Sequence, residues 1–203
     1  MLIILALLLY KFMSQSSSLV ISPTKPPNSK PAKPAYRTRL LIKAQAAKSF
    51  AAQKGFCSRY AFMIDMGLPS GQNRFFICDL QKNAVLYAGL VAHGSCNTRF
   101  LETAQFSNRA GCGCSSVGRY KVGGAYEGRF GKSFKLFGLD STNSNAYQRA
   151  VVLHGYSCVP DAEPYPMPIC NSLGCTMVSY KFLSLATGII EKEKKPILLW
   201  VYN

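Results

Sequence analysis

Short runs of hydrophobic residues alternate with glycine, proline and asparagine between residues 60 and 203. Runs that are rich in β-branched and aromatic side chains, with turn residues on both sides, are typical of β-strands. The pattern predicts strands at residues 60–66, 74–80, 84–92, 118–126, 134–139, 150–154 and 197–202. One amphipathic helix is predicted near residues 179–186. Many short strands with few helices indicate a mainly β fold, an antiparallel sandwich or barrel with one or two flanking helices.

A helical pattern precedes the first strand. Residues 40–54 are rich in alanine, and Leu41, Ala44 and Phe50 suggest a hydrophobic stripe along one side of a helix. Gly55 stands where a glycine commonly ends a helix. We therefore expect a helix that docks on the β domain and flanks it.

The first 39 residues have the composition of a leader and a linker. Residues 1–13 open with a hydrophobic run shorter than the roughly 20 residues that span a bilayer. The run fits a signal peptide or a short membrane anchor, although the usual basic start is missing. Residues 14–39 are rich in serine and proline and predict an extended linker. The predicted organisation continues with the flanking helix at 40–55 and a catalytic domain at 56–203.

The formal net charge of +15 is unevenly distributed. Residues 1–64 contain ten Lys or Arg residues and no acidic residue, whereas residues 65–203 contain fourteen basic and nine acidic residues. A basic segment of this kind is attracted to anionic envelope polymers or to lipid head groups. It lacks the interleaved aromatic side chains that stack on bases, so we do not expect a nucleic acid partner.

The candidate chemistry lies near the C-terminal end of this pattern. His154 ends a predicted strand, and Cys175 follows a glycine 21 residues later. A cysteine with an ordinary pKa of about 8.5 is mostly protonated at neutral pH, and a nearby imidazole can accept its proton. Gly174 allows a sharp turn whose amides can face a developing oxyanion. Ser172 either orients His154 or the substrate, or simply stabilises the turn.

The order of these residues resembles a known active-site signature. His154-Gly155 followed by Ser172-x-Gly174-Cys175 is similar to the motif of the murein L,D-transpeptidase catalytic domains. Further similar blocks follow in the order of the branch best known from Bacteroidota and proteobacteria, at residues 62–65, 74–80, 91–94, 107–108, 115–118 and 138–140.

Two positions depart from the commoner form of the motif. Leu173 replaces a histidine before the Gly-Cys pair, and Met177 replaces an arginine after it. The group that holds the donor carbonyl or carboxylate must then lie elsewhere, and Arg149 is the candidate. Gly155 and His93 complete the expected substrate-binding set.

The resemblance implies an exported cell-wall enzyme, located in the periplasm or cell envelope. Its cysteine would form a thioester with a peptidoglycan stem peptide and transfer the acyl group to an amine, or to water as an L,D-carboxypeptidase. Such chemistry needs no metal and no organic cofactor, and we expect a monomer. Two alternatives stay open: a non-catalytic peptidoglycan-binding module, and a cysteine peptidase or amidase with another substrate.

Eight cysteines in 203 residues favour an oxidising compartment. If Cys175 stays free as the nucleophile, at least one of the other seven is also unpaired. Cys158 and Cys170 bracket the loop between the two catalytic candidates and are the preferred disulfide pair. The cysteines at 96, 112 and 114 lie near His93 and form a weak zinc pattern, for which a disulfide within the set is the stronger expectation.

Overall fold

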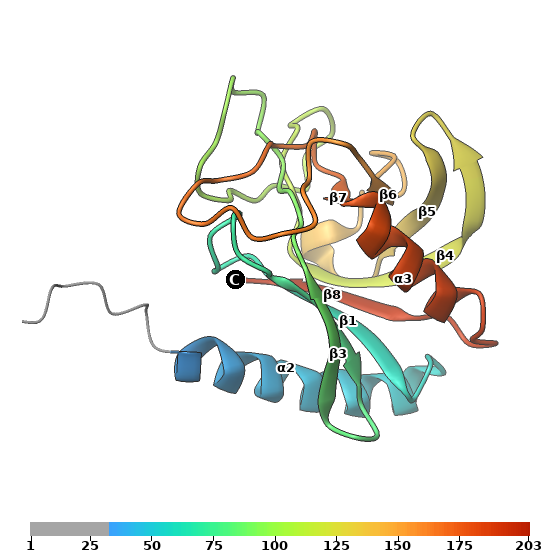
Figure 1. Cartoon of the computed structure of the whole chain (residues 1–203). Helices are drawn as coiled ribbons and strands as arrows, with labels where there is room; N and C mark the ends of the chain where they lie inside the picture. Colours follow the sequence, from blue (N-terminus) through green and yellow to red (C-terminus); the bar gives the residue numbers. More distant parts are fainter. Residues whose placement is uncertain (1–32) are drawn as a thin grey trace, which may run out of the picture. The chain divides into compact units, whose positions relative to one another are not determined.

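The computed structural model describes residues 33–203, which form one compact unit. An eight-stranded sheet lies between two α-helices, with α2 on one face and α3 on the other (Figure 1). The predicted segment 1–13 and most of the predicted linker 14–39 lie outside the described residues. Between residues 33 and 203, no helix is both long enough and hydrophobic enough to cross a bilayer.

The strands run in the order β3-β2-β1-β8-β4-β5-β6-β7 across the sheet. Their bounds are β1 Tyr60–Asp65, β2 Phe75–Asp79, β3 Ala84–Gly89, β4 Gly118–Gly128, β5 Gly131–Gly138, β6 Val152–Gly155, β7 Thr176–Val178 and β8 Leu198–Tyr202. The helices are α2 Lys33–Lys54, the 3-10 turn η1 Ser141–Asn143 and α3 Tyr180–Ile190.

The mainly β class with flanking helices is confirmed, but the sheet is mixed rather than antiparallel throughout. The pairs β1–β8 and β6–β7 are parallel, and the remaining neighbours are antiparallel. An isolated bridge between Ala92 and Met177 connects the chain beyond β3 to β7, so the two ends of the sheet approach each other. This partial closure gives the sheet its barrel-like character.

All seven predicted strands are present, with ends that differ by a few residues. The sequence analysis missed β7, because it consists of only three residues and follows the loop that carries Cys175. It pairs with β6 in parallel, a pairing that a local pattern does not reveal.

Strand β1 shows how the sequence builds two cores at once. Phe62 and Ile64 pack in the larger core, which α3 covers, while Ala61 and Met63 pack in the smaller core, which α2 covers. Successive side chains of a strand point to opposite faces of the sheet. A strand covered on both faces therefore reads as a continuous hydrophobic run rather than an alternating one.

Helix α2 begins at Lys33, seven residues before the predicted start, so it includes the last part of the predicted linker. Proline is tolerated in the first turn of a helix, where its missing N–H has no partner in any case. The buried side of the helix carries Leu40, Ala47 and Ala51, whereas Leu41, which we had placed in the hydrophobic stripe, is exposed. The helix is part of the fold rather than an addition to it.

Candidate functional site

Strands β6 and β7 bring His154 and Cys175 to the same face of the sheet. The parallel register places His154 beside Met177, and Cys175 directly precedes β7. Side chains alternate along a strand, so Cys175 points to the same side as Met177 and hence as His154. The pairing of β6 with β7 therefore brings the segments that carry the two candidates next to each other.

His154 is buried and is held in one orientation. Its ring stacks on Phe130 with 4.2 Å between ring centroids, and Tyr156 meets it edge-on. Its Nδ1 lies 3.0 Å from the Gly155 carbonyl oxygen. A carbonyl only accepts hydrogen bonds, so Nδ1 carries the proton and Nε2 keeps the lone pair of a general base. Burial lowers the pKa of His154, although the Gly155 bond opposes this, and the ring is therefore neutral near pH 7.

The thiol of Cys175 rests against the backbone of the segment before β6. Its Sγ donates to the Ala150 carbonyl oxygen at 3.8 Å rather than to the imidazole. Burial raises the pKa of Cys175, while the Val152 backbone bond and the charge of Arg149 partly offset that rise. The resting side chain is therefore a thiol and not a thiolate.

Ala150 has a left-handed backbone conformation, with φ of 54°. This conformation is uncommon for a residue with a Cβ atom, and such strain costs on the order of 1–3 kcal/mol. It occurs at the residue whose carbonyl accepts the Cys175 thiol. The surrounding fold thus holds a strained backbone next to Cys175.

The turn before Cys175 is closed by Ser172 and Gly174. The Ser172 hydroxyl donates to the Cys175 carbonyl oxygen at 2.8 Å and accepts from the Gly174 N–H at 3.1 Å. Gly174 has φ of 107°, and a Cβ there would lie 2.7 Å from the Cys114 carbonyl oxygen. Ser172 thus has the contacts of a turn-stabilising hydroxyl. The Gly174 N–H is already bonded, so it does not face an oxyanion in this geometry.

Arg149, the expected substrate-binding residue, is instead occupied by protein partners. Its guanidinium donates to the Ser107 carbonyl at 2.8 Å, to the Ser116 hydroxyl and to the Cys114 carbonyl. These contacts hold the loop that precedes β4 against the Cys175 turn. Both terminal nitrogens of the Arg149 guanidinium thus have protein acceptors, and its role in binding a donor carboxylate stays a prediction.

Gly155 and His93 are also buried and contact other groups of the protein. Gly155 is buried, and a Cβ there would lie 2.6 Å from the Tyr180 ring. His93 is fully buried; its Nδ1 accepts from Arg74 at 2.8 Å, and its Nε2 donates to the Leu101 carbonyl at 3.0 Å. Burial and the charge of Arg74 lower the pKa of His93 to about 4.

His93 still connects to the site through its backbone. Its carbonyl oxygen accepts the Ser172 N–H at 2.8 Å. His93 thus supports the Ser172 turn in this structure, and its expected contact with a substrate stays a prediction.

The disulfides agree with the sequence analysis. Cys158 pairs with Cys170, as preferred, and Cys96 pairs with Cys114 within the set near His93. The second bridge consumes two of the four residues in the weak zinc pattern. No group of three or more His, Cys, Asp or Glu side chains that could hold a metal is found in residues 33–203. The free cysteines are Cys57, Cys78, Cys112 and Cys175.

The sequence analysis missed Phe130, Ala150 and Tyr156 as parts of the site. Phe130 lies in the turn between β4 and β5, and it reaches His154 because β5 pairs with β6. The backbone conformation of Ala150 depends on tertiary contacts and has no sequence signal. The sequence shows Phe130 only as an aromatic residue next to Gly131, which does not indicate a contact with His154.

The profile of the L,D-transpeptidase catalytic domain family matches residues 33–202. The chain therefore belongs to this family of peptidoglycan-acting domains. No curated protein matches the sequence significantly.

Three solved structures illustrate the similarity. The helical cell shape determining protein Pgp2 from Campylobacter jejuni is 11% identical, with a TM-score of 0.45, over 80% of this chain and 56% of that one. An L,D-transpeptidase from Xylanimonas cellulosilytica is 13% identical, with a TM-score of 0.40, over 76% and 68%. The Ldtfm–avibactam carbamoyl enzyme is 12% identical, with a TM-score of 0.45, over 72% and 50%. The chain spans little more than half the length of the Pgp2 protein.

Proposed function

We propose that this protein is a cysteine-dependent acyltransferase that acts on peptidoglycan stem peptides. The observation that carries the proposal is the placement of His154 and Cys175 on one face of paired strands, with Nε2 of His154 free of the Gly155 bond. Family membership supplies the substrate class, since the matching domains are L,D-transpeptidases. Cys175 is the proposed nucleophile and His154 the proposed general base.

In the acylation step, the Cys175 thiol leaves the Ala150 carbonyl and transfers its proton to His154 Nε2. The sulfur attacks a peptide carbonyl of the donor stem, and the backbone N–H of Cys175 is the proposed oxyanion donor. The tetrahedral intermediate collapses, the C–N bond breaks, and the leaving amine takes the proton from His154. The product is a thioester on Cys175 and a released amine, which the family resemblance implies is D-alanine.

In the second step, an acceptor amine attacks the thioester while His154 accepts its proton. The sulfur leaves as a thiolate and recovers that proton, which restores the resting enzyme. Water in place of the amine gives the carboxypeptidase outcome by the same steps. The acceptor thus decides which product forms, and the residues that carry the chemistry are the same.

We further propose that the protein is exported and works in the cell envelope. Its two disulfides are typical of an oxidising compartment, and its substrate class lies in the cell wall. A signal peptide or short anchor at residues 1–13 belongs to the same proposal.

The test is incubation of the full chain with defined tetrapeptide muropeptides, followed by mass spectrometry of the products and of the intact protein. We expect release of D-alanine and a transient acyl adduct that maps to Cys175. The Cys175→Ala variant should form no adduct and release nothing, with an unchanged thermal unfolding midpoint. Binding of muropeptides without any turnover by the wild type would favour the non-catalytic wall-binding module instead. Cleavage only of unrelated peptides would favour another cysteine peptidase or amidase.

A further inference from the structure

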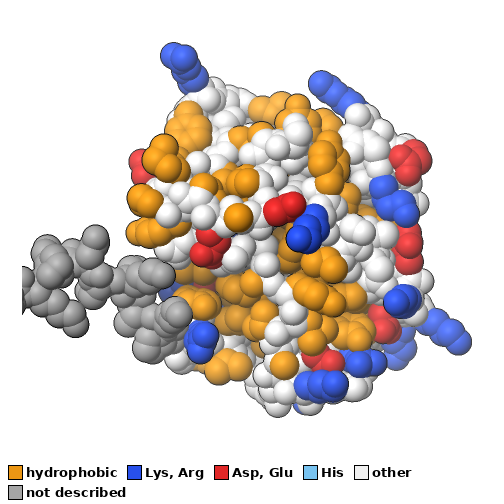
Figure 2. All heavy atoms as spheres, viewed as in Figure 1, with side chains coloured by type: hydrophobic (Ala, Val, Ile, Leu, Met, Phe, Trp, Pro, Cys, Tyr) orange, Lys and Arg blue, Asp and Glu red, His pale blue; other side chains and the backbone are white. Residues whose placement is uncertain are grey.

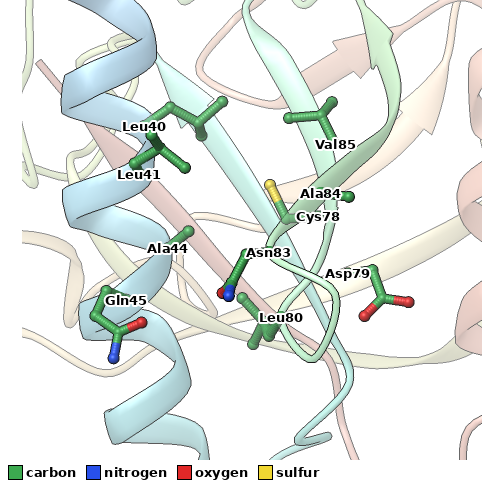
Figure 3. A pocket seen from close by; sticks show the side chains of 10 residues that line it. All are labelled: Leu40, Leu41, Ala44, Gln45, Cys78, Asp79, Leu80, Asn83, Ala84 and Val85. Carbon is green, nitrogen blue, oxygen red and sulfur yellow. The ribbon is translucent and has the colours of Figure 1, made fainter.

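An apolar groove lies far along the sheet from the catalytic pair, between α2 and the β2–β3 hairpin. Its volume is about 310 Å³. Figure 3 shows Leu40, Leu41 and Ala44 of α2 facing Cys78 and Val85 of the hairpin. None of these side chains takes part in the chemistry proposed above.

Several hydrophobic side chains at and beside the edges of this groove are exposed to solvent. On α2, Leu41 and Ile42 are 59% and 64% exposed. On the hairpin, residues 84–88 are all exposed, and Val85 is 47% exposed. Among residues 33–203, β3 is also an edge strand of the sheet, so one side of its backbone is not paired with another strand of this part of the chain. Contiguous exposed hydrophobic patches usually mark an interaction surface.

Basic residues are frequent beside the groove, but Asp79 lines it, and Arg39 and Arg59 form ion pairs with Asp65 and Asp79. Residues 36–64 contain six basic residues and no acidic one. Arg37 lies four residues before Leu41, and Lys48 lies seven residues after it, so all three share one side of α2. Figure 2 shows basic and hydrophobic side chains next to each other over the lower part of the molecule, where α2 and β3 lie.

The sequence before α2 also combines basic and hydrophobic residues. It directly precedes Lys33, and residues 1–32 contain a hydrophobic run at 1–9 and three lysines without any acidic residue. A basic helix with exposed hydrophobic side chains is the combination that binds the interface of an anionic membrane. The sequence on both sides of Lys33 thus favours the same class of partner.

We propose that the surface formed by α2 and β3 docks on an anionic phospholipid bilayer. Leu41, Ile42 and Val85 enter the boundary between head groups and acyl chains, and Arg37 and Lys48 pair with lipid phosphates. A second copy of this chain is a poorer occupant, because the surface is basic and would meet its own charge. A soluble polyanion would satisfy the basic residues but would leave the hydrophobic rim in water.

The first experiment is hydrogen exchange of the full chain with vesicles of phosphatidylglycerol and phosphatidylcholine. We expect increased protection in peptides covering 36–48 and 82–89, little change in α3, and loss of the effect with phosphatidylcholine alone or at high salt. Vesicle binding without protection of these peptides would overturn the proposal. Equal protection by soluble polyphosphate would assign the surface to polyanions, and protection that rises with protein concentration alone would assign it to a second copy.

The second experiment uses matched substitutions in the full chain. The double variant Leu41→Gln and Val85→Gln removes two exposed hydrophobic side chains and should weaken vesicle binding by about tenfold or more. The control variant Phe100→Gln and Met167→Gln changes residues that are 49% and 65% exposed outside α2 and the β2–β3 hairpin, and it should bind as the wild type does. Equal binding by all three proteins would refute the docking surface. Turnover of a small soluble muropeptide reports separately on the proposed catalytic function and should be unchanged in the double variant.

Discussion

At the scale of single residues, the site is defined by the tautomer of His154 and by the protonation of Cys175. The Gly155 carbonyl selects the imidazole form that accepts a proton at Nε2, and burial keeps the Cys175 thiol protonated at rest. In the proposed mechanism, the Cys175 thiol must lose its proton to His154 before the sulfur can attack. The thiol turns in that mechanism from Ala150 to the imidazole, and the rate then depends on His154 being neutral.

The pH dependence follows from the lowered pKa of His154. A base whose pKa lies below 6.5 stays neutral, and therefore competent, at more acidic pH than an ordinary histidine. We expect the acid limb of kcat/KM for a small muropeptide to fall below pH 6.5. The His154→Ala variant should lose that limb and about 10²–10⁴ of the rate. An acid limb above pH 6.5, or a rate within threefold of the wild type, would exclude His154 as the base.

A second residue-scale prediction concerns Arg149, which holds the loop before β4 and lowers the pKa of Cys175 through its charge. Arg149→Met removes both effects, whereas Arg149→Lys keeps the charge but not the forked hydrogen bonds. We expect the pH profile of Cys175 alkylation to move to higher pH in the methionine variant and to move less in the lysine variant. Equal shifts in both would show that the hydrogen bonds, and not the charge, set the thiol pKa.

At the scale of elements, the loop between β6 and β7 must fold back so that parallel strands become neighbours. The Cys158–Cys170 bridge closes much of this loop, and Val159 and Ile169 beside it are buried together in a small cluster. Because the bridge restrains the unfolded chain, it stabilises the folded state by about 3 kcal/mol in the chain-entropy estimate.

The Cys158→Ala and Cys170→Ala double variant should therefore unfold at lower urea concentration, with a loss of about 3 kcal/mol. Reduction of the wild type should cost at least as much, because it opens the Cys96–Cys114 bridge as well. The control is Cys57→Ala, which removes a buried thiol that is not in a disulfide. A double variant as stable as the wild type would show that packing alone holds the loop.

At the scale of the whole molecule, α2 closes the second core of the sheet. Leu40, Ala47 and Ala51 pack there with Met63 and Phe76 of the central strands. The ion pair between Arg39 and Asp65, at 2.8 Å, ties the helix to β1. Helix α2 thus closes one of the two cores that the sheet supports, and α3 closes the other.

Truncation distinguishes the two parts of the N-terminal region. A chain that begins at Lys33 keeps α2 and should unfold at the same urea concentration as the full chain. A chain that begins at Lys54 exposes the second core, and it should lose several kcal/mol of stability, since each large buried side chain contributes about 1.5–3 kcal/mol. Full stability of the shorter chain would mean that α2 is dispensable for folding.

The sequence by itself determined the strand-rich class and indicated the Cys158–Cys170 disulfide, and it singled out His154 and Cys175 as candidates, but it left open which cysteines near His93 form a bridge. Their signals are local: hydrophobic runs between turn residues, a histidine that ends such a run, and cysteines that bracket a loop. Tertiary structure decided the mixed pairing, the short strand β7 and the start of α2. Parallel pairing joins segments that are distant in sequence, and a helix that packs against a core can extend through residues with weak helical preference.

The chemical roles around the site also depended on tertiary structure. Arg149 and His93 carry the residue types of a binding site, yet their hydrogen bonds go to the protein. The strained conformation of Ala150 and the stacking of Phe130 on His154 leave no mark in the sequence. The residue type fixes which chemical groups a side chain carries. The neighbours that the fold provides decide which of its donors are free, how far its pKa shifts and how exposed it is.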